Sequence, residues 1–376
     1  MFTIGVEEEY LLLDLGSGLP VARSEQLLDI LRLRSAVAEE QVHPELLQAQ
    51  VEVSTPVCES LDQVRSSLAG LRSAVSTAAA QVGCGVAASG AAPVRGQVPI
   101  PVTAQARYLA IFADAPRLVD EQLINGMHVH VAVPDRDSGV AVLNRIRPWL
   151  PVLVAMGANS PLWDGHDTGF ASWRTVVFGR WPVSGAPPAF ADAADYGRRT
   201  QALLDTDAIR DRGQVHWQAR LSERFPTVEV RALDVQLRVE DAVLFTGLIR
   251  ALVVRALELE RSGAPAADGH PELIAAANWK AARHGLDADL ADPGSPPGRP
   301  NRHRPAAEVV GALLDELGPS LEQSGDYQEV AAGVHRLLRD GTGATRQRRA
   351  FADGGLDALI DELLLVPGPV STLGRI

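Results

Sequence analysis

Acidic and histidine side chains occupy alternate positions in four segments whose intervening residues are mostly apolar. The segments read GVEEE, QVEVSTP, GMHVHV and TVEVRAL, and their polar positions of interest are Glu7, Glu9, Glu52, His128, His130, Glu229 and Arg231. Because successive side chains of a β-strand point to opposite faces, each segment presents these residues on one face. Such strands are expected to pack the apolar face on a core and to line a cleft with the polar face.

Carboxylates that converge on one cleft predict a cation site. They repel each other and raise their own pKa values, and divalent cations remove that penalty. A ligand set dominated by oxygen atoms, with an added imidazole, favours Mg²⁺ or Mn²⁺. Glu45, upstream of Glu52, joins the candidate ligands. The sequence contains neither the helical His-Glu-x-x-His pattern of zinc proteases nor a GxxxxGK[ST] phosphate-binding loop.

Each of these signals also has an ordinary structural explanation. Glu7 and Glu9 are typical of a solvated strand edge, and an H-x-H pair is often structural. A glutamate within VEV is commonly the exposed side of a strand. Glu229 and Arg231 could form a surface ion pair worth at most about 1 kcal/mol. Four such segments in one chain favour a shared site, but spacing alone leaves both interpretations open.

Composition excludes several classes of protein. The chain has 376 residues, of which 46% are hydrophobic and 22% charged, so it can bury a substantial core. Its formal net charge of −12 argues against a general affinity for nucleic acid. The cysteines, Cys58 and Cys84, are too few for a disulfide framework or a thiolate zinc site. No signal peptide or membrane span is indicated, so we expect a cytoplasmic protein with small-molecule partners.

The elements that must position the polar residues can be predicted from apolar spacing. Strands are expected over residues 2–13, 43–56, 84–88 and 125–133 and within 218–234, and helices over 24–38, from 61 onward, and over 140–156, 240–261, 306–317 and 327–339. Prolines interrupt the helix over 140–156. Residues 158–188 are expected to form an ordered loop region. Strands mix with helices without regular alternation, which favours an α+β fold.

One domain is expected over residues 1–376. Residues 287–305 form a connector rich in Pro, Gly and Arg, which could mark a domain boundary. The helices beyond it, however, have apolar stripes that need a partner surface. We therefore expect the helical part from about residue 305 to pack on the main body.

Longer motifs resemble those of a known family. The bacterial glutamate–cysteine ligase type 2 family, also called YbdK-type carboxylate–amine ligases, has in the same order the segments GVEEEYLLLD, VEVSTP, GMHVHV, ANSPLWDGHDTGFASWR, RLSERFPTVEVRALD, AARHGLD and GTGATRQR. The resemblance covers nearly the whole chain and is greatest to the actinobacterial branch. GMHVHV and VEVR also resemble segments of glutamine synthetase. The implied fold is a curved, mainly antiparallel sheet backed by helices, as in glutamine synthetase and guanidino kinases.

The resemblance also implies roles for single residues. The implied metal ligands are Glu7, Glu9, Glu45, Glu52, His128 and Glu229. His130 matches a histidine nearer the substrate carboxylate and Arg231 an arginine that contacts the transferred phosphoryl group, so both are expected to be catalytic and to bind substrate. Arg174, in FASWR, matches a basic residue beside the cleft that would bind substrate or nucleotide. Arg346, in GTGATRQR, is a weaker match, and a solvated helix end is its favoured interpretation.

The implied reaction is ATP-dependent amide formation through an acyl phosphate, with Mg²⁺ holding the phosphates. The expected substrates are L-glutamate and L-cysteine, which would give γ-glutamylcysteine, ADP and phosphate. Met127 and the loop over 90–101 depart from the family's usual residues near regions that could contribute to acceptor choice, so a different amine stays open. A guanidino-kinase-like phosphotransferase and a non-catalytic ATP-binding protein are further alternatives. Related enzymes suggest a homo-oligomer.

Overall fold

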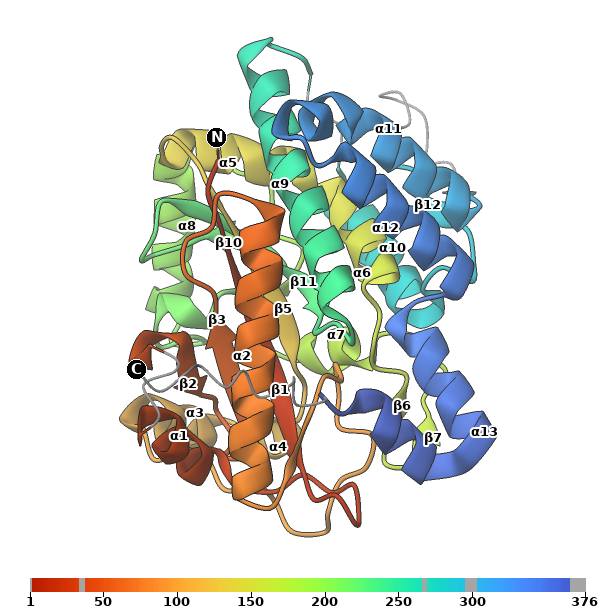
Figure 1. Cartoon of the computed structure of the whole chain (residues 1–376). Coiled ribbons are helices and arrows are strands. Elements are labelled where there is room, and N and C mark those ends of the chain that lie inside the picture. The colour runs from red at the N-terminus through yellow and green to blue at the C-terminus, as the bar shows by residue number, and fades with distance from the viewer. Residues whose placement is uncertain (1, 34–37, 266–268, 295–302, 366–376) are drawn as a thin grey trace, which may run out of the picture.

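A seven-stranded antiparallel sheet forms the centre of the computed structural model, which describes residues 2–33, 38–265, 269–294 and 303–365 (Figure 1). The strand order is β10-β11-β5-β1-β3-β2, and β4 also pairs with β1. The strands are β1 (Ile4–Leu13), β2 (Val42–Pro44), β3 (Gln50–Ser54), β4 (Gly85–Ala87), β5 (Gly126–Ala132), β10 (Ala219–Leu221) and β11 (Thr227–Asp234). Every pairing within this sheet is antiparallel. The expected α+β fold, a mainly antiparallel sheet backed by helices, is confirmed.

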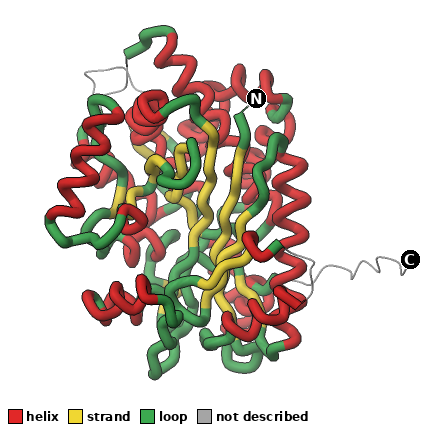
Figure 2. Tube along the Cα trace, turned by 90° about the vertical axis from the view of Figure 1, so that its left-hand side faces the viewer, coloured by secondary structure: helices red, strands yellow, loops and turns green. Residues whose placement is uncertain are grey.

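Long helices cover one face of the sheet, in front of it in Figure 1 and to its right in Figure 2. They are α2 (Leu61–Gln81) and α9 (Val239–Arg261), with α11 (Ala306–Ser324) and α12 (Tyr327–Asp340) packed on α9. The apolar faces of the strands point toward these helices: Val6, Val129 and Val230 lie in one buried core with Leu68 of α2 and Phe245 of α9. The helices after residue 305 therefore share the core of the central sheet.

Prolines divide the helix expected over 140–156. The structure has α5 (Arg136–Ile146), a 3₁₀ turn η2 (Arg147–Trp149) and α6 (Leu150–Met156). Pro148 and Pro151 lie in the first turns of η2 and α6, where their missing N–H groups cost no intrahelical hydrogen bond.

The segment 158–188, expected to be a loop, contains regular elements. They are β6 (Leu162–Trp163), β7 (His166–Asp167), α7 (Trp173–Phe178) and β8 (Ser184–Gly185). These elements span two to six residues each, too short to show an apolar period in the sequence. The expectation of a loop throughout this segment is therefore wrong. Helix α7, within this segment, holds Arg174, one of the candidate site residues.

The remaining elements surround the sheet. They are α1 (Ser24–Leu33), η1 (Glu39–Gln41), α3 (Ala106–Asp114), α4 (Pro116–Asp120), α8 (Ala193–Asp205), η3 (Arg212–Gln214), β9 (His216–Trp217), α10 (Pro271–His284), β12 (Leu290–Ala291), β13 (His303–Arg304) and α13 (Gly343–Leu363). The end of the helix expected over 24–38 and part of the connector over 287–305 lie outside the described residues. Among the helices that are described, none has the length and apolarity needed to cross a membrane.

Candidate active site

The polar faces of four neighbouring strands meet on the side of the sheet away from α2 and α9. Register places opposite one another Glu7 and His128, Glu9 and Glu52, and His130 and Glu229. Directly opposed residues of an antiparallel pair have side chains on the same face, close enough to interact. The alternation seen in the sequence therefore becomes one continuous polar wall.

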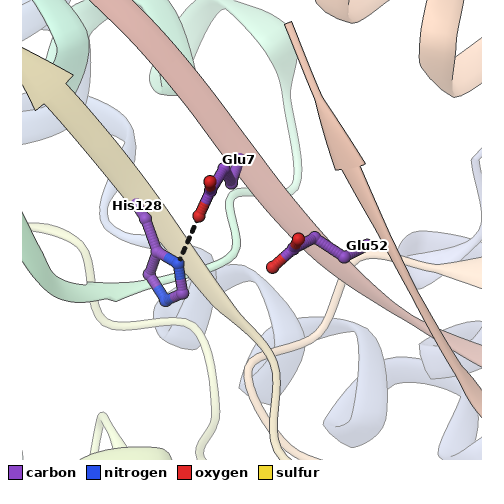
Figure 3. Close-up of side chains that lie close together, drawn as sticks. All are labelled: Glu7, Glu52 and His128. Carbon is purple, nitrogen blue, oxygen red and sulfur yellow. Dashed lines mark hydrogen bonds and ion pairs between the residues drawn. The ribbon is translucent and has the colours of Figure 1, made fainter. Parts of the chain in front are cut away.

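Glu7 is the centre of this wall. Its Oε2 lies 3.0 Å from Nδ1 of His128, and its Oε1 lies 3.4 Å from Nε2 of His130. Figure 3 shows Glu7 and His128 from β1 and β5 turned toward each other, with Glu52 of β3 pointing into the same space. Nε2 of His128 is 3.5 Å from Oε1 of Glu9. This atom and Nε2 of His130 are buried and face carboxylates, but neither makes a hydrogen bond.

Three overlapping groups of side chains have the geometry to hold cations. They are Glu7, Glu52 and His128; Glu7, His130 and Glu229; and Glu9, Glu45 and Glu52, with the ligand atoms of each group within 4.8 Å of one another. Because Glu7 and Glu52 each belong to two groups, the three form one connected cluster. Carboxylate oxygens dominate it, which is the donor set of Mg²⁺ or Mn²⁺. Nε2 of His128, which is buried and makes no hydrogen bond, fits the same interpretation.

The carboxyl groups at the Glu52 end of the cluster are hard to ionise without a cation. Burial, and then the charge of Glu9, raises the pKa of Glu45 to about 8. Burial, and then Glu7 and Glu45, raises the pKa of Glu52 well above its ordinary value. Glu7 behaves differently. Burial opposes its ionisation, but the two histidines outweigh burial and hold its pKa well below the ordinary value.

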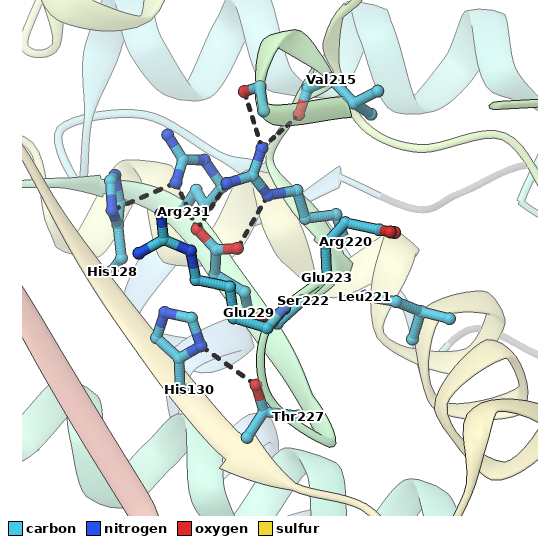
Figure 4. Close-up of polar contacts among 12 residues, drawn as sticks. His128, His130, Val215, Arg220, Leu221, Ser222, Glu223, Thr227, Glu229 and Arg231 are labelled. Carbon is cyan, nitrogen blue, oxygen red and sulfur yellow. Dashed lines mark hydrogen bonds and ion pairs between the residues drawn. The ribbon is translucent and has the colours of Figure 1, made fainter. Parts of the chain in front are cut away.

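Arg231 and Glu229 form the positively charged end of the wall. Arg231 lies within the irregular pairing between Val230 and Leu233, a β-bulge, and its Nη1 contacts Oε1 of Glu229. Figure 4 shows Arg220 of β10 on the other side of Glu229, with its Nε 2.7 Å from Oε2. Burial opposes ionisation of Glu229, but the two arginines hold its pKa far below the ordinary value.

The Arg231 guanidinium also reaches the histidines. Its Nη1 lies 3.2 Å from Nδ1 of His128, whose pKa is lowered by burial and then by Arg231 (Figure 4). Nδ1 of His130 lies 3.1 Å from the hydroxyl of Thr227. Burial lowers the pKa of His130, but Glu7 and Glu229 outweigh burial and raise it. Neighbouring imidazoles are thus biased toward opposite protonation states.

A buried aspartate positions Arg174 beside the wall. Asp234, at the end of β11, accepts hydrogen bonds from the hydroxyls of Ser160 and Ser172 at 2.7 and 2.9 Å and from the backbone N–H of Asn159 at 2.7 Å. Ser172 is also the N-cap of α7, the helix that holds Arg174. This network explains why a short helix is stable within a segment rich in Gly and Pro.

Arg174 is 3% exposed and forms no ion pair with any described carboxylate. Its guanidinium lies against Gly126, where an added Cβ would be 2.2 Å from Nη2. A side chain at the first position of β5 would therefore displace the guanidinium of Arg174. Beyond Arg174 and Arg231 is a cavity of about 590 Å³, lined also by residues of α7 and α10.

The opposite face of β1 carries a charge cluster that sequence reasoning missed. Glu8 is fully buried, and its carboxylate accepts from Nε of Arg72, on α2, at 3.0 Å and from the hydroxyl of Tyr10. This buried ion pair joins the sheet to α2 on the side away from the site. The only available signal was the helical spacing that puts Arg72 among apolar positions of α2.

Two residues of the site were also not identified from the sequence, Arg220 and Thr227. Arg220 could be found only by pairing β10 with β11, because it lies directly opposite Glu229. Thr227 could be found only by pairing β11 with β5, which brings it to His130. Arg346 is outside the cluster: it lies in the first turn of α13 and pairs with Glu362, which follows the kink of α13 at Gly354 and Gly355.

Comparisons with known proteins agree with this geometry. The model of a family described as glutamate-cysteine ligase family 2 matches residues 3–362. A protein from Mycolicibacterium vanbaalenii named "Putative glutamate–cysteine ligase 2-2" is 44% identical over 351 residues, 93% of each chain. A protein from Rhodopirellula baltica named "Putative glutamate–cysteine ligase 2" is 37% identical over 377 residues, covering 99% of this chain and 98% of its own.

A solved structure has a similar fold. The glutamate–cysteine ligase of Francisella tularensis, in complex with AMP, superposes with a TM-score of 0.71 over 96% of this chain and 87% of its own, at 12% identity. A bifunctional glutathione synthetase from Pasteurella multocida gives a TM-score of 0.66 over 96% of this chain and 51% of its own, at 14% identity. The central sheet and its helices are thus an arrangement found in solved ligases.

Proposed function

Since the chain belongs to glutamate–cysteine ligase family 2, we propose that it is an ATP-dependent carboxylate–amine ligase that joins L-glutamate to L-cysteine or another amine. The observation that carries the proposal is the single wall on which acids from β1, β3 and β11 and histidines from β5 lie beside Arg231. The AMP in the similar ligase of F. tularensis supports a nucleotide substrate.

Amide formation needs an activated carboxylate because oxide is a poor leaving group. Transfer of the γ-phosphoryl group of ATP to the carboxylate gives an acyl phosphate, which an amine then attacks. Mg²⁺ bound to the acids would neutralise the triphosphate and act as a Lewis acid. Glu7 and Glu52 are each shared by two of the three groups of the cluster, and Glu229 belongs to the group that also contains Glu7 and His130.

The remaining residues of the wall stabilise charge and orient the substrate. Arg231, held by Glu229, would stabilise charge on the phosphoryl group as it moves. His130, oriented through Nδ1 by Thr227 and favoured in its charged form, would contact the donor carboxylate through Nε2, which makes no hydrogen bond in this structure. Arg174 supplies a second positive charge, on which the charges of Asp234 and Glu9 act without a direct ion pair, and we assign it to substrate binding.

Product identification tests the proposal. The protein is incubated with ATP, Mg²⁺, L-glutamate and a panel of amines, and products are measured by mass spectrometry and phosphate release. A ligase gives an amide, ADP and phosphate, and the product mass identifies the amine. A guanidino-kinase-like enzyme would form ADP and a phosphorylated product without releasing phosphate, and a non-catalytic binding protein would form neither.

A matched pair of variants tests the site itself. Arg231→Met should abolish phosphate release. Arg255→Met is the control, because Arg255 lies on α9 and pairs with Glu316 of α11, away from the wall. Equal activity of the two variants would contradict the assignment of Arg231.

A further inference from the structure

Helix α3 lies at one end of the central sheet and is held there by few contacts. Ile111 is the one buried residue among the nine of this helix. Leu109 and Phe112 of the same helix are 49% and 36% exposed. The hydroxyl of Tyr108 donates to the backbone carbonyl of Pro44 in β2, the last strand of the sheet order, at 3.4 Å. Helix α3 is thus attached to the β2 end of the sheet (Figure 1).

The segment that follows α8 is fixed to the opposite end of the sheet. We call this segment, residues 207–215, the rim. Ile209 and Val215 are buried in the main core. Arg220, in the last strand β10 at this end, donates through Nη1 to the backbone carbonyls of Gly213 and Val215 at 2.9 and 3.0 Å. The same guanidinium pairs with the glutamate of β11, so the rim is joined firmly to the acidic wall.

Two reciprocal ion pairs connect α3 to the rim. Arg107, in the first turn of α3, pairs with Asp211, and its Nε lies 2.8 Å from Oδ2. Asp114, the last residue of α3, pairs in turn with Arg210. We call these four residues the latch. Because α2 and α9 cover the other face of the sheet, a connection between its two ends passes in front of the polar wall.

Helix α3 and the latch cover part of the wall. Burial, and then the charge of Glu45, raises the pKa of Tyr108, so this ring lies close to the acids. The side chains of Glu9 and Glu229 are 15% and 4% exposed. A nucleoside triphosphate and its metal ions are too large to reach carboxylates covered to this extent unless part of the chain moves.

The latch is of a kind that can open. Its four side chains are between 41% and 53% exposed. Ion pairs with this exposure contribute little to stability and are screened by salt. The pair of Arg72 and Glu8 on the other face is different, because these side chains are 7% and 0% exposed and form a permanent connection. Elements that move to admit ligands have few buried apolar contacts, which describes α3 and not the rim.

We propose that α3 is a lid over the acidic wall, and that the latch opens to admit and release the ligands of the wall. Thr103 before the helix and Val119 after it are buried, so they stay in place while the helix between them moves. The identity of the ligands rests on the proposed function, whereas the movement of α3 does not.

Hydrogen–deuterium exchange followed by mass spectrometry measures the opening without any ligand. The double variant Asp114→Asn, Asp211→Asn removes both carboxylates of the latch, so the amides of α3 should exchange about fivefold faster while those of α9 are unchanged. Concentrated NaCl should speed the exchange of α3 in wild type but not in the double variant. Glu316→Gln is the matched control, because it breaks a partly exposed pair with Arg255 between α9 and α11. Unchanged exchange of α3 in the double variant would overturn the proposal.

A cross-link tests whether the opening serves ligand exchange. Asp114→Cys and Arg210→Cys are joined by a short bis-maleimide, which the two native cysteines escape because they are buried. The locked protein should have a kcat/KM for ATP lowered at least about tenfold. Protein that is locked with Mg²⁺ and ADP already bound should release ADP at least about tenfold more slowly than before cross-linking. A cross-link between Arg255→Cys and Glu316→Cys should change neither quantity.

The release experiment separates a closed site from a damaged one. A site distorted by the cross-link loses its nucleotide, whereas a site beneath a closed lid keeps it. Release of ADP from the locked protein at the original rate would therefore overturn the proposal. Wild-type protein that binds no ADP would instead overturn the proposed function, and the exchange of α3 would still decide whether the lid opens.

Discussion

Glu45 should make the metal-free protein less stable as the pH rises. Its pKa is raised to about 8 in the folded chain, from an ordinary value of 4.5, by burial and then by the charge of Glu9. Between these values the folded chain binds more protons than the unfolded chain, so the free energy of unfolding falls with increasing pH. The stabilisation is fully present below pH 4.5 and is lost as the pH rises through 8.

The size of the effect follows from the protonation of this one group. At about pH 6.5, Glu45 is almost fully protonated in the folded chain, and at pH 8 it is half protonated. Integrating the difference in bound protons over this window gives a loss on the order of 1–2 kcal/mol in the free energy of unfolding. Glu45 keeps partial exposure, and solvent screening makes this an upper value.

Urea unfolding followed by circular dichroism measures the effect. Wild type and Glu45→Gln are each unfolded in the presence of EDTA at both ends of this pH window. The change in the free energy of unfolding between the two pH values should be smaller in the variant by up to the amount given above. Mg²⁺ should abolish the loss in wild type, because the cation pairs with the ionised carboxylate and favours release of its proton. The same pH dependence in both proteins would refute the reasoning.

Three further substitutions separate the roles of the two sheet faces. Glu52→Gln should lower phosphate release by orders of magnitude, and full activity would refute the assignment of Glu52 as a ligand. The melting temperature, followed by circular dichroism, should be kept or raised, because a buried carboxyl with a raised pKa is removed. Arg72→Met should cost about 3–5 kcal/mol in urea unfolding because it leaves Glu8 buried and unpaired, with the KM for ATP unchanged; stability equal to wild type would contradict this. Gly126→Ala should displace Arg174 and lower kcat/KM at least about tenfold with a small change in melting temperature; unchanged kinetics would show that the close approach is not needed.

The acidic wall could be predicted from the sequence because strand periodicity is fixed. Alternation of Glu7 and Glu9 with Val6 and Glu8 determines which side chains share a face, whatever the neighbouring strands are. The order of the strands could not be derived from alternation, and the resemblance implied only a curved, mainly antiparallel sheet. The site residues placed on strands therefore came together, and Glu45, from the turn before β3, joined them.

Features that depend on long-range contacts could not be predicted. Helix α7 is short, and its stability comes from Asp234, whose partners Ser160 and Ser172 are more than 60 residues earlier in the sequence. The pairing of Glu8 with Arg72 likewise joins a strand to a helix 64 positions later. Neither distance leaves a periodic signal, since such contacts follow from the packing of the whole chain.

The three consecutive glutamates of β1 bear on how the chain avoids misfolding. A slip of β1 by one residue against β5 would turn every side chain to the other face. Glu7 and Glu9 would then enter an apolar layer with Arg72 available for only one carboxylate, and Tyr10 would be moved into the solvated cleft. Unpaired buried charges make that arrangement very unfavourable. The acids proposed for catalysis thus also disfavour a shifted register of β1 during sheet assembly. Substituting them with apolar residues should therefore favour misaligned, aggregation-prone chains.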